Sequence, residues 1–163
     1  MLEPIIGFSL FFFVIFLLRR SSNKNREKLY QKLIKKIKPE TKLYIEQTRS
    51  STLTWGLKNS NFLFNRCDIY LTETAIIILG YTKDSFFKEL SLPIILTNEI
   101  DIYANEFPYC YLKKVNKITF ENNIVKIYFG EKGILQTEVT IKLAHLNESE
   151  LKAIKLIAEK NSW

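Results

Sequence analysis

Residue types that supply most enzyme and metal chemistry are scarce in this chain. Among 163 residues there are two cysteines, Cys67 and Cys110, and one histidine, His145. Two cysteines are too few for a disulfide framework, so we expect both to be reduced thiols. A zinc site needs clustered cysteine and histidine ligands, which this spacing does not provide. The sequence therefore predicts no metal site and no cofactor.

Sequence motifs of catalysis are also missing. The five glycines form no phosphate-binding loop and no dinucleotide-binding fingerprint, and there is no metalloprotease helix motif. A Ser–His or Cys–His pair would have to use His145, whose neighbours Ala144 and Leu146 place it at a strand-to-helix junction. We interpret His145 as structural and expect that the protein is not an enzyme.

The chain has one long hydrophobic run, residues 2–18. At ~1.5 Å per residue the run reaches roughly 26 Å, just under a hydrocarbon core of about 30 Å, so spanning needs a locally thinner bilayer or snorkelling arginines. A cleaved signal peptide is disfavoured, because no basic residue precedes the run and no small-residue cleavage site follows it. A buried soluble helix is disfavoured by five phenylalanines that make the run apolar all round. We predict a transmembrane anchor at residues 1–18.

A basic segment, residues 19–38, follows this run. It has nine basic residues and one acid, Glu27, whereas residues 39–163 hold 15 basic and 15 acidic residues. The segment carries +8 and Glu3 of the run −1, so the net charge of +7 lies outside the folded domain, which argues against nucleic-acid binding by that domain. The residues expected to contact an anionic membrane surface are Arg19, Arg20, Lys24, Arg26, Lys28, Lys32, Lys35, Lys36 and Lys38.

The placement of these charges also predicts a topology. Basic residues favour the cytoplasmic side of a membrane, and here they all follow the predicted anchor. We expect a single pass through the inner (plasma) membrane, with the N-terminus outside and residues 39–163 in the cytoplasm. The expected partners are the anionic inner leaflet and a membrane protein, and not nucleic acid.

Residues 21–38 have the pattern of a basic amphipathic helix. Polar residues can cap its start, Pro39 ends it, and Leu29, Leu33 and Ile37 recur at four-residue spacing. Two interpretations of this stripe are open. It lies on a lipid surface, or it packs on the following domain while the lysines face solvent, and both can hold at once.

Residues 39–163 are long enough for one domain with a single core. Apolar patterns predict strands at residues 41–48, 52–57, 62–71, 75–81, 92–97, 115–120 and 124–129, and another around Val139, Ile141 and Leu143. The continuous apolar run at 75–81 indicates a strand covered on both faces. Within 62–71, Leu63 and Cys67 are expected on one face, and Phe62 and Phe64 on the other. Residues 98–111 fit no pattern.

Two local signals are clearer. Asn122 and Asn123 predict a hairpin turn, because asparagine tolerates a positive φ. Near the end of the chain, Asn147 followed three residues later by Glu150 resembles a capping box, and the apolar spacing after it predicts an amphipathic helix over residues 146–160.

The order of about seven strands and a C-terminal helix leads to a family. Residues 69–77, IYLTETAII, resemble a strand–turn–strand pattern of the bacterial membrane-anchored pleckstrin-homology-like (bacterial PH, GRAM-related) proteins. The order of the predicted strands and helix extends this resemblance over residues 41–160. The resemblance implies an α+β, mainly β, fold. It would comprise a membrane helix, a basic helix and a PH-like sandwich or barrel of about seven antiparallel strands with a C-terminal helix. It also implies scaffolding or lipid and peptide contacts rather than catalysis.

The expected function is therefore a non-enzymatic, membrane-anchored binding or scaffold module that contacts lipid headgroups or a membrane protein. The alternative is a protein-interaction factor, of immunity or assembly type, that the anchor merely localises. Four aromatic residues in irregular stretches, Phe86, Phe87, Tyr109 and Tyr111, are either contact residues or plugs at the open ends of the β-structure.

Overall fold

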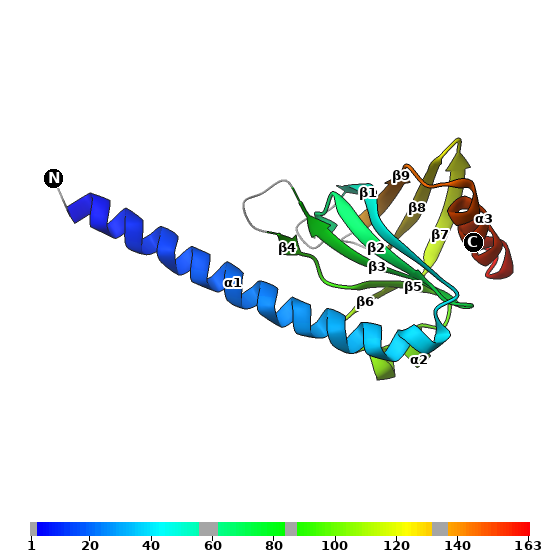
Figure 1. The fold of residues 1–163 in the computed structure, drawn as a ribbon, viewed down its shortest axis with the longest axis horizontal. Coiled ribbons are helices and arrows are strands. Elements are labelled where there is room, and N and C mark those ends of the chain that lie inside the picture. The colour runs from blue at the N-terminus through cyan, green and yellow to red at the C-terminus, as the bar shows by residue number, and fades with distance from the viewer. Residues whose placement is uncertain (1–2, 56–61, 84–87, 132–136) are drawn as a thin grey trace.

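The computed structural model describes residues 3–55, 62–83, 88–131 and 137–163. The helices are α1 (Glu3–Ile37), the 3-10 helix η1 (Lys38–Glu40), α2 (Ile100–Glu106) and α3 (Glu148–Lys160). The strands are β1 (Leu43–Trp55), β2 (Arg66–Leu71), β3 (Ala75–Thr82), β4 (Glu89–Leu90), β5 (Ile94–Thr97), β6 (Tyr111–Lys113), β7 (Val115–Glu121), β8 (Ile124–Glu131) and β9 (Thr137–Ala144). Figure 1 shows a strongly curved sheet, with α1 along one side and α3 on another.

The strands of the described residues form one sheet in the order β6-β5-β3-β2-β1-β9-β8-β7, and β4 pairs with β3 beside this path. Each pair is antiparallel except β5 and β6, which are parallel. The prediction of about seven antiparallel strands is therefore wrong. The unpredicted strands β4 and β6 have two and three residues, too few for hydrophobic alternation to be visible.

Helix α1 is one helix of 35 residues that continues through the predicted boundary between Leu18 and Arg19. No proline or glycine lies between Gly7 and Pro39, so no residue interrupts the helical hydrogen bonds there. In the described part of the chain, no helix is both long enough and apolar enough to cross a membrane. The predicted membrane helix, the separate basic helix and the single-pass localisation in the inner membrane are therefore wrong. The apolar run is short, and charges follow it within the same helix.

Two hydrophobic clusters lie on opposite faces of the sheet. The α3-side core includes Ile76, Ile78, Ile94, Val125, Ile127, Phe129, Ile141, Leu143, Ile154 and Ile157. The α1-side core includes Tyr30, Leu33, Ile37, Ile77, Leu79, Tyr81, Ile95, Tyr103 and Phe107. The domain thus has a layer of helix on each face of part of its sheet, which is a common way to bury both faces.

Strand β3 lies between these clusters, as its sequence predicts. Successive side chains of a strand point to opposite faces. Ile76 and Ile78 therefore enter the α3-side core, and Ile77 and Leu79 enter the α1-side core. Seven of the eight residues of β3 are buried. The prediction of a strand covered on both faces is confirmed.

Strand β1 replaces the two short elements predicted at 41–48 and 52–57. Its pairing with β2 shifts register between Ile45 and Thr48, so Glu46 and Gln47 together lie opposite Asp68. This is a β-bulge, and Gln47 has a positive φ of 52°. The backbone amide of Gln47 donates to Asp68 Oδ1 at 2.9 Å, and this hydrogen bond stabilises the bulge. The predicted break, residues 49–51, is polar in sequence, but pairing with β9 carries the strand through it.

The segment before β2 also differs from its prediction. Phe62 and Phe64 lie in the α3-side core beside Cys67, whereas Leu63 is exposed. The cause is a close approach of Phe64 to Gly80 of β3. A Cβ added at Gly80 would lie 2.4 Å from Cγ of Phe64, so only glycine leaves room for this ring. The described residues before Arg66 therefore do not continue the pleat of β2.

Several local predictions are confirmed. Strands β7 and β8 form the predicted hairpin, with Asn122 at a φ of 51°. Asn147 and Glu150 form a complete capping box at the start of α3. Strand β9 alternates as predicted, with Val139 and Ile141 buried. The helix α2 lies within residues 98–111, for which the sequence predicted nothing.

Candidate functional site

The C-terminal half of α1 is packed on the sheet. Leu33 and Ile37 are buried in the α1-side core, and Leu29 is half-buried. Tyr30 donates its hydroxyl hydrogen to Gly80 O at 2.7 Å and lies 3.1 Å from Ser91 O. The apolar stripe of this helix therefore packs on the domain. This confirms the second of the two interpretations of residues 21–38.

Polar contacts extend this docking toward the N-terminus of α1. The side chain of Asn23 accepts a hydrogen bond from the amide of Leu90 at 3.0 Å and donates to the carbonyl of Lys88. The guanidinium of Arg26 donates to the carbonyl of Leu90. Each of these bonds satisfies a backbone group of β4 or its neighbour, at the edge of the sheet.

Docking fixes which side of α1 faces away from the sheet. A helix turns by about 100° per residue, so a residue two positions from a buried one points roughly the opposite way. Lys28 lies two positions before the buried Tyr30, and Lys35 lies two positions after the buried Leu33. Four exposed lysines form what we call the outer basic face of α1: Lys24, Lys28, Lys32 and Lys35.

The other basic residues predicted as surface contacts divide into two groups. Arg26 is bonded to the sheet, and the ammonium group of Lys36 lies 5.2 Å from the centre of the Phe107 ring, a cation–π contact that joins α1 to the end of α2. Arg19, Arg20 and Lys38 are exposed. Two of the nine predicted contact residues are thus used within the fold.

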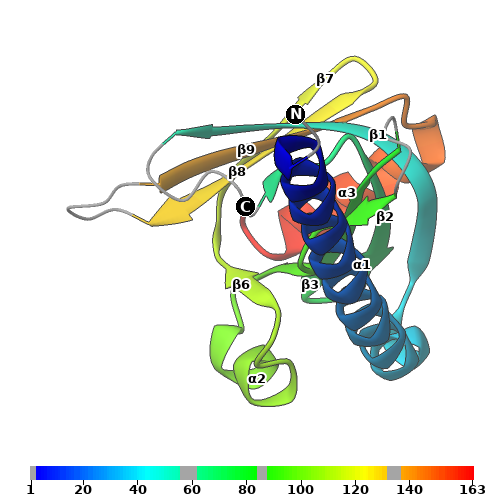
Figure 2. The ribbon, with the colours of Figure 1, turned by 90° about the vertical axis from the view of Figure 1, so that its left-hand side faces the viewer.

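The N-terminal half of α1 extends beyond the sheet (Figure 1), and Figure 2 views the molecule from the side of this N-terminus. Its described side chains include five exposed large apolar residues, Phe11, Phe13, Val14, Leu17 and Leu18, with 45–65% of each exposed. Leu17, Lys24, Lys28 and Lys35 follow one another at spacings of seven, four and seven, so they share one face of the helix. Phe13 and Val14, four and three positions before Leu17, lie on the same face, whereas Phe11 and Leu18 lie to its sides. Three exposed apolar residues therefore continue into the outer basic face.

The two thiols are poor nucleophiles in this fold. Burial raises the pKa of the Cys67 thiol to about 12, and that of the Cys110 thiol to about 11. Thiolate, the reactive form, is therefore scarce near neutral pH. Cys67 is fully buried among apolar side chains, as its position in the strand predicts.

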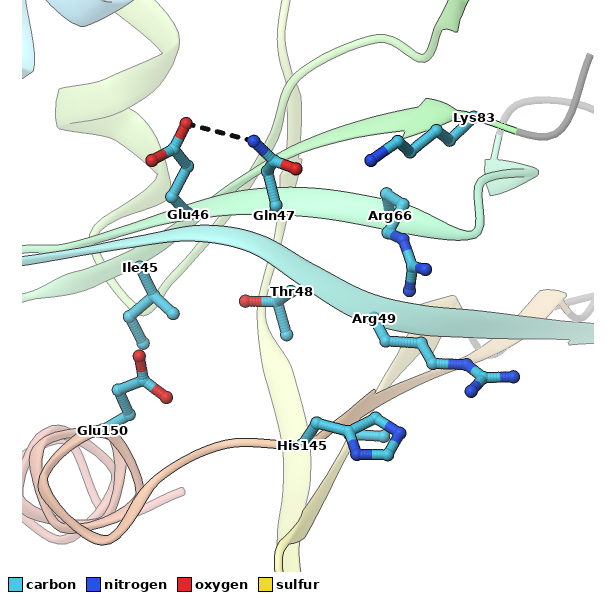
Figure 3. Close-up of a pocket in the computed structure, with 10 residues that line it drawn as sticks. Ile45, Glu46, Gln47, Thr48, Arg49, Arg66, Lys83, His145 and Glu150 are labelled. Carbon is cyan, nitrogen blue, oxygen red and sulfur yellow. Dashed lines mark hydrogen bonds between the residues drawn. The ribbon is translucent and has the colours of Figure 1, made fainter.

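His145 follows β9 with a φ of 62° and is exposed, at the junction that the sequence predicts. It lies on a hollow of about 380 Å³ that Arg49, Arg66 and Lys83 also line (Figure 3). Among the described residues, His145 has no hydrogen bond to a hydroxyl, thiol or carboxylate. Glu46 and Glu150 line the hollow as well, and the basic side chains outnumber them. The sequence missed Arg49 and Arg66, because neither belongs to a basic run and only strand pairing brings them together.

The search for metal ligands and for contact aromatics gives a short result. In the part of the chain that the structure describes, no three His, Cys, Asp or Glu side chains are placed to hold a metal ion. Tyr111 packs on the α3-side core with its ring 5.1 Å from that of Phe62, which fits the plug interpretation, while Tyr109 is exposed. Phe86 and Phe87 lie outside the described residues.

Comparison with known proteins identifies no relative. No family model matches the chain, and no curated protein or solved structure matches it. The resemblance to PH-like proteins thus stays a prediction from the sequence, and functional argument rests on the surfaces of this molecule.

Proposed function

We propose that the protein is a non-enzymatic binding module that attaches peripherally to an anionic lipid surface through α1. One observation carries the proposal: exposed apolar residues at one end of the helix continue into the outer basic face on the same side. Large exposed apolar patches mark interaction sites, and the adjoining lysines favour a negatively charged partner. The opposite side of α1 holds the β-domain against this surface.

Both parts contribute several kcal/mol to membrane attachment. A basic residue near an anionic leaflet contributes about 1 kcal/mol, so the outer basic face contributes ~4 kcal/mol. Full burial of a phenylalanine or leucine side chain contributes about 1.5–3 kcal/mol. One weak signal gives only reversible attachment, whereas an apolar insertion combined with a polybasic patch gives stable attachment. The helix combines both signals without crossing the bilayer.

Co-sedimentation of the full chain with lipid vesicles tests this proposal. We expect binding to vesicles of phosphatidylcholine with phosphatidylserine, and much weaker binding to phosphatidylcholine alone. Replacement of all four lysines of the outer basic face by glutamine should weaken binding to anionic vesicles about a thousandfold, from the loss of ~4 kcal/mol.

A matched control removes the same charge elsewhere. Lys114, Lys117, Lys152 and Lys155 are exposed and lie on or beside β7 and on α3. Their joint replacement by glutamine should leave binding within about threefold, since charges far from the contact are screened. An equal loss of vesicle binding in both variants would show that only the net charge of the protein matters. No loss of binding in either variant would show that α1 does not contact the membrane.

A second candidate function is a protein-binding module, and a different surface favours it. Leu53 and Trp55, near the end of β1, are 61% and 71% exposed on the face of the sheet opposite the α3-side core. Exposed tryptophan is typical of protein interfaces. Capture of one stoichiometric partner that is lost on Trp55→Ser, combined with vesicle binding that does not depend on the lysines, would favour this function.

A further inference from the structure

Two arginines of adjacent strands face each other next to the β1 bulge. Arg49 of β1 pairs with Arg66 of β2 on one side and with Ala144 of β9 on the other. Directly opposed residues of an antiparallel pair have their Cβ atoms about 4.5–5.5 Å apart, and like charges at such positions repel each other. The fold thus places two guanidinium groups together at a cost in stability.

In the described part of the chain, no carboxylate forms an ion pair with either guanidinium group. Among the described residues, neither Arg49 nor Arg66 takes part in an ion pair or a side-chain hydrogen bond. Two acids line the same hollow, but both have other roles. Glu150 accepts from the backbone amide of Asn147 in the α3 capping box, and Glu46 accepts from the side-chain amide of Gln47 at 3.4 Å. The unpaired positive charge therefore remains available to a ligand.

Two further basic side chains complete the site. Lys83 follows β3, and its backbone amide donates to the side chain of Asn65 at 3.0 Å, which fixes this end of the strand beside Arg66. His145 enters from the turn after β9. Figure 3 shows these four basic side chains along one side of the hollow, with Glu46 and Glu150 toward the other.

A second hollow, of about 650 Å³, adjoins the first and shares Arg49, Ala144 and His145 with it. It adds Lys142 of β9 and the two asparagines of the β7–β8 turn. Five parts of the fold therefore contribute hydrogen-bond donors to a depression made of these two adjoining hollows, and no single segment of the sequence contains them. Its combined size suits a small molecule rather than a single ion.

We propose that this depression binds a phosphate monoester, held by the guanidinium groups of Arg49 and Arg66, with Lys83 and His145 as further donors. Arginine presents a planar fork of donors that matches two phosphate oxygens, and such charge-assisted pairs are the strong ones. A dianion between the two guanidinium groups also cancels their repulsion. This site is separate from α1, and the ligand is either a free phosphorylated molecule or the headgroup of a lipid.

Calorimetric titration of the full chain with glycerol 3-phosphate tests the shared chemistry, at constant ionic strength. We expect saturable binding that the double variant Arg49→Gln/Arg66→Gln weakens on the order of a hundredfold, because two charge-assisted contacts are lost. The affinity of Arg49→Lys should fall between those of the unmodified chain and the double variant, since lysine keeps the charge but lacks the planar pair of donors. The control Lys114→Gln/Lys117→Gln removes two charges, one from β7 and one just before it, and should bind like the unmodified chain.

A stability measurement separates a binding role from a structural one. Without ligand, the double variant should be at least as stable as the unmodified chain, since it removes a like-charge pair. Glycerol 3-phosphate should raise the melting temperature of the unmodified chain and not that of the variant. A variant that is folded and still gains stability from the ligand would overturn the proposal, as would absence of binding by the unmodified chain.

Vesicles distinguish the two sources of the ligand. Phosphatidic acid carries a phosphate monoester, whereas phosphatidylserine carries a diester. A lipid source predicts binding to phosphatidic acid vesicles that exceeds binding to phosphatidylserine vesicles and depends on Arg49 and Arg66. A free source predicts binding of glycerol 3-phosphate with no preference for phosphatidic acid. The α1 lysine variant keeps this site intact. Failure of the proposed membrane attachment through α1 can therefore be distinguished from failure of the proposed phosphate site.

Discussion

The two halves of the sheet are built differently. Strands β3 and β5 have apolar side chains on both faces, with α1 and α2 over one of them, and eleven of their twelve residues are buried. Strand β9, in the other half, buries only alternate residues and leaves the rest half-buried or exposed. The first half thus needs a helix from another part of the chain, and the second half needs only the α3-side core. The two proposed interaction surfaces differ in the same way: one is the outer face of α1, and the other is the open face of β1.

The largest effect that separates the halves is expected from truncation in the α1-side core. Ile77→Ala should lower the free energy of unfolding by about 2–5 kcal/mol, because a buried isoleucine loses its contacts and leaves a cavity. Thr140→Ala, on the open face of β9, should change it by less than about 1 kcal/mol. Urea unfolding measures both. Similar losses for the two variants would contradict the difference in coverage.

A smaller effect is expected where α1 meets the sheet. Tyr30→Phe removes the hydrogen bond to the Gly80 carbonyl, which should cost about 1 kcal/mol. Tyr128→Phe, on the open half, removes a hydroxyl with no bond among the described residues, and should be nearly neutral. Hydrogen exchange of the α1 amides adds a local readout. Unchanged protection of α1 in the Tyr30 variant would show that this bond does not hold the helix.

The smallest effect concerns pH at the boundary between the halves. Partial burial raises the pKa of the Asp68 carboxyl above its usual value, despite the hydrogen bond from the Gln47 amide. The folded state therefore holds this proton to a higher pH than the unfolded state does, and stability contributed by Asp68 falls as pH rises through that interval. Asp68→Asn keeps an oxygen acceptor for the bulge and should remove this slope, with a change within about 0.5 kcal/mol near neutral pH. Urea midpoints measured across the acidic range give the slope, and an unchanged slope would contradict the prediction.

Prediction from the sequence succeeded where one local cause dominates. The capping box at Asn147, the asparagine turn at Asn122 and the doubly buried β3 each follow from a few consecutive residues. Prediction failed where distant contacts decide. The bulge at Gln47 depends on Asp68, and the exposure of Leu63 depends on the packing of Phe64 over Gly80.

The candidate sites show the same division. The basic residues of α1 are visible as a run, but only docking shows that Arg26 and Lys36 are used within the fold and that four lysines face outward. The apolar run led to the prediction of a membrane anchor, because the hydropathy of these residues does not show that they belong to a longer helix with charged residues. The pair Arg49 and Arg66 has no sequence signal, since its members lie 17 positions apart and meet only through strand register.

The sequence by itself determined the capped start of α3, the β7–β8 turn, the doubly buried β3, the neutral charge of residues 39–163 and the concentration of basic residues beside an apolar run. These properties depend on neighbouring residues and on counting. The tertiary structure alone decided which side of α1 faces outward, which basic residues remain available and which arginines stand opposite each other. Each of these depends on pairing between residues far apart in the chain, where a shift of one position in register would turn every side chain of a strand to the other face.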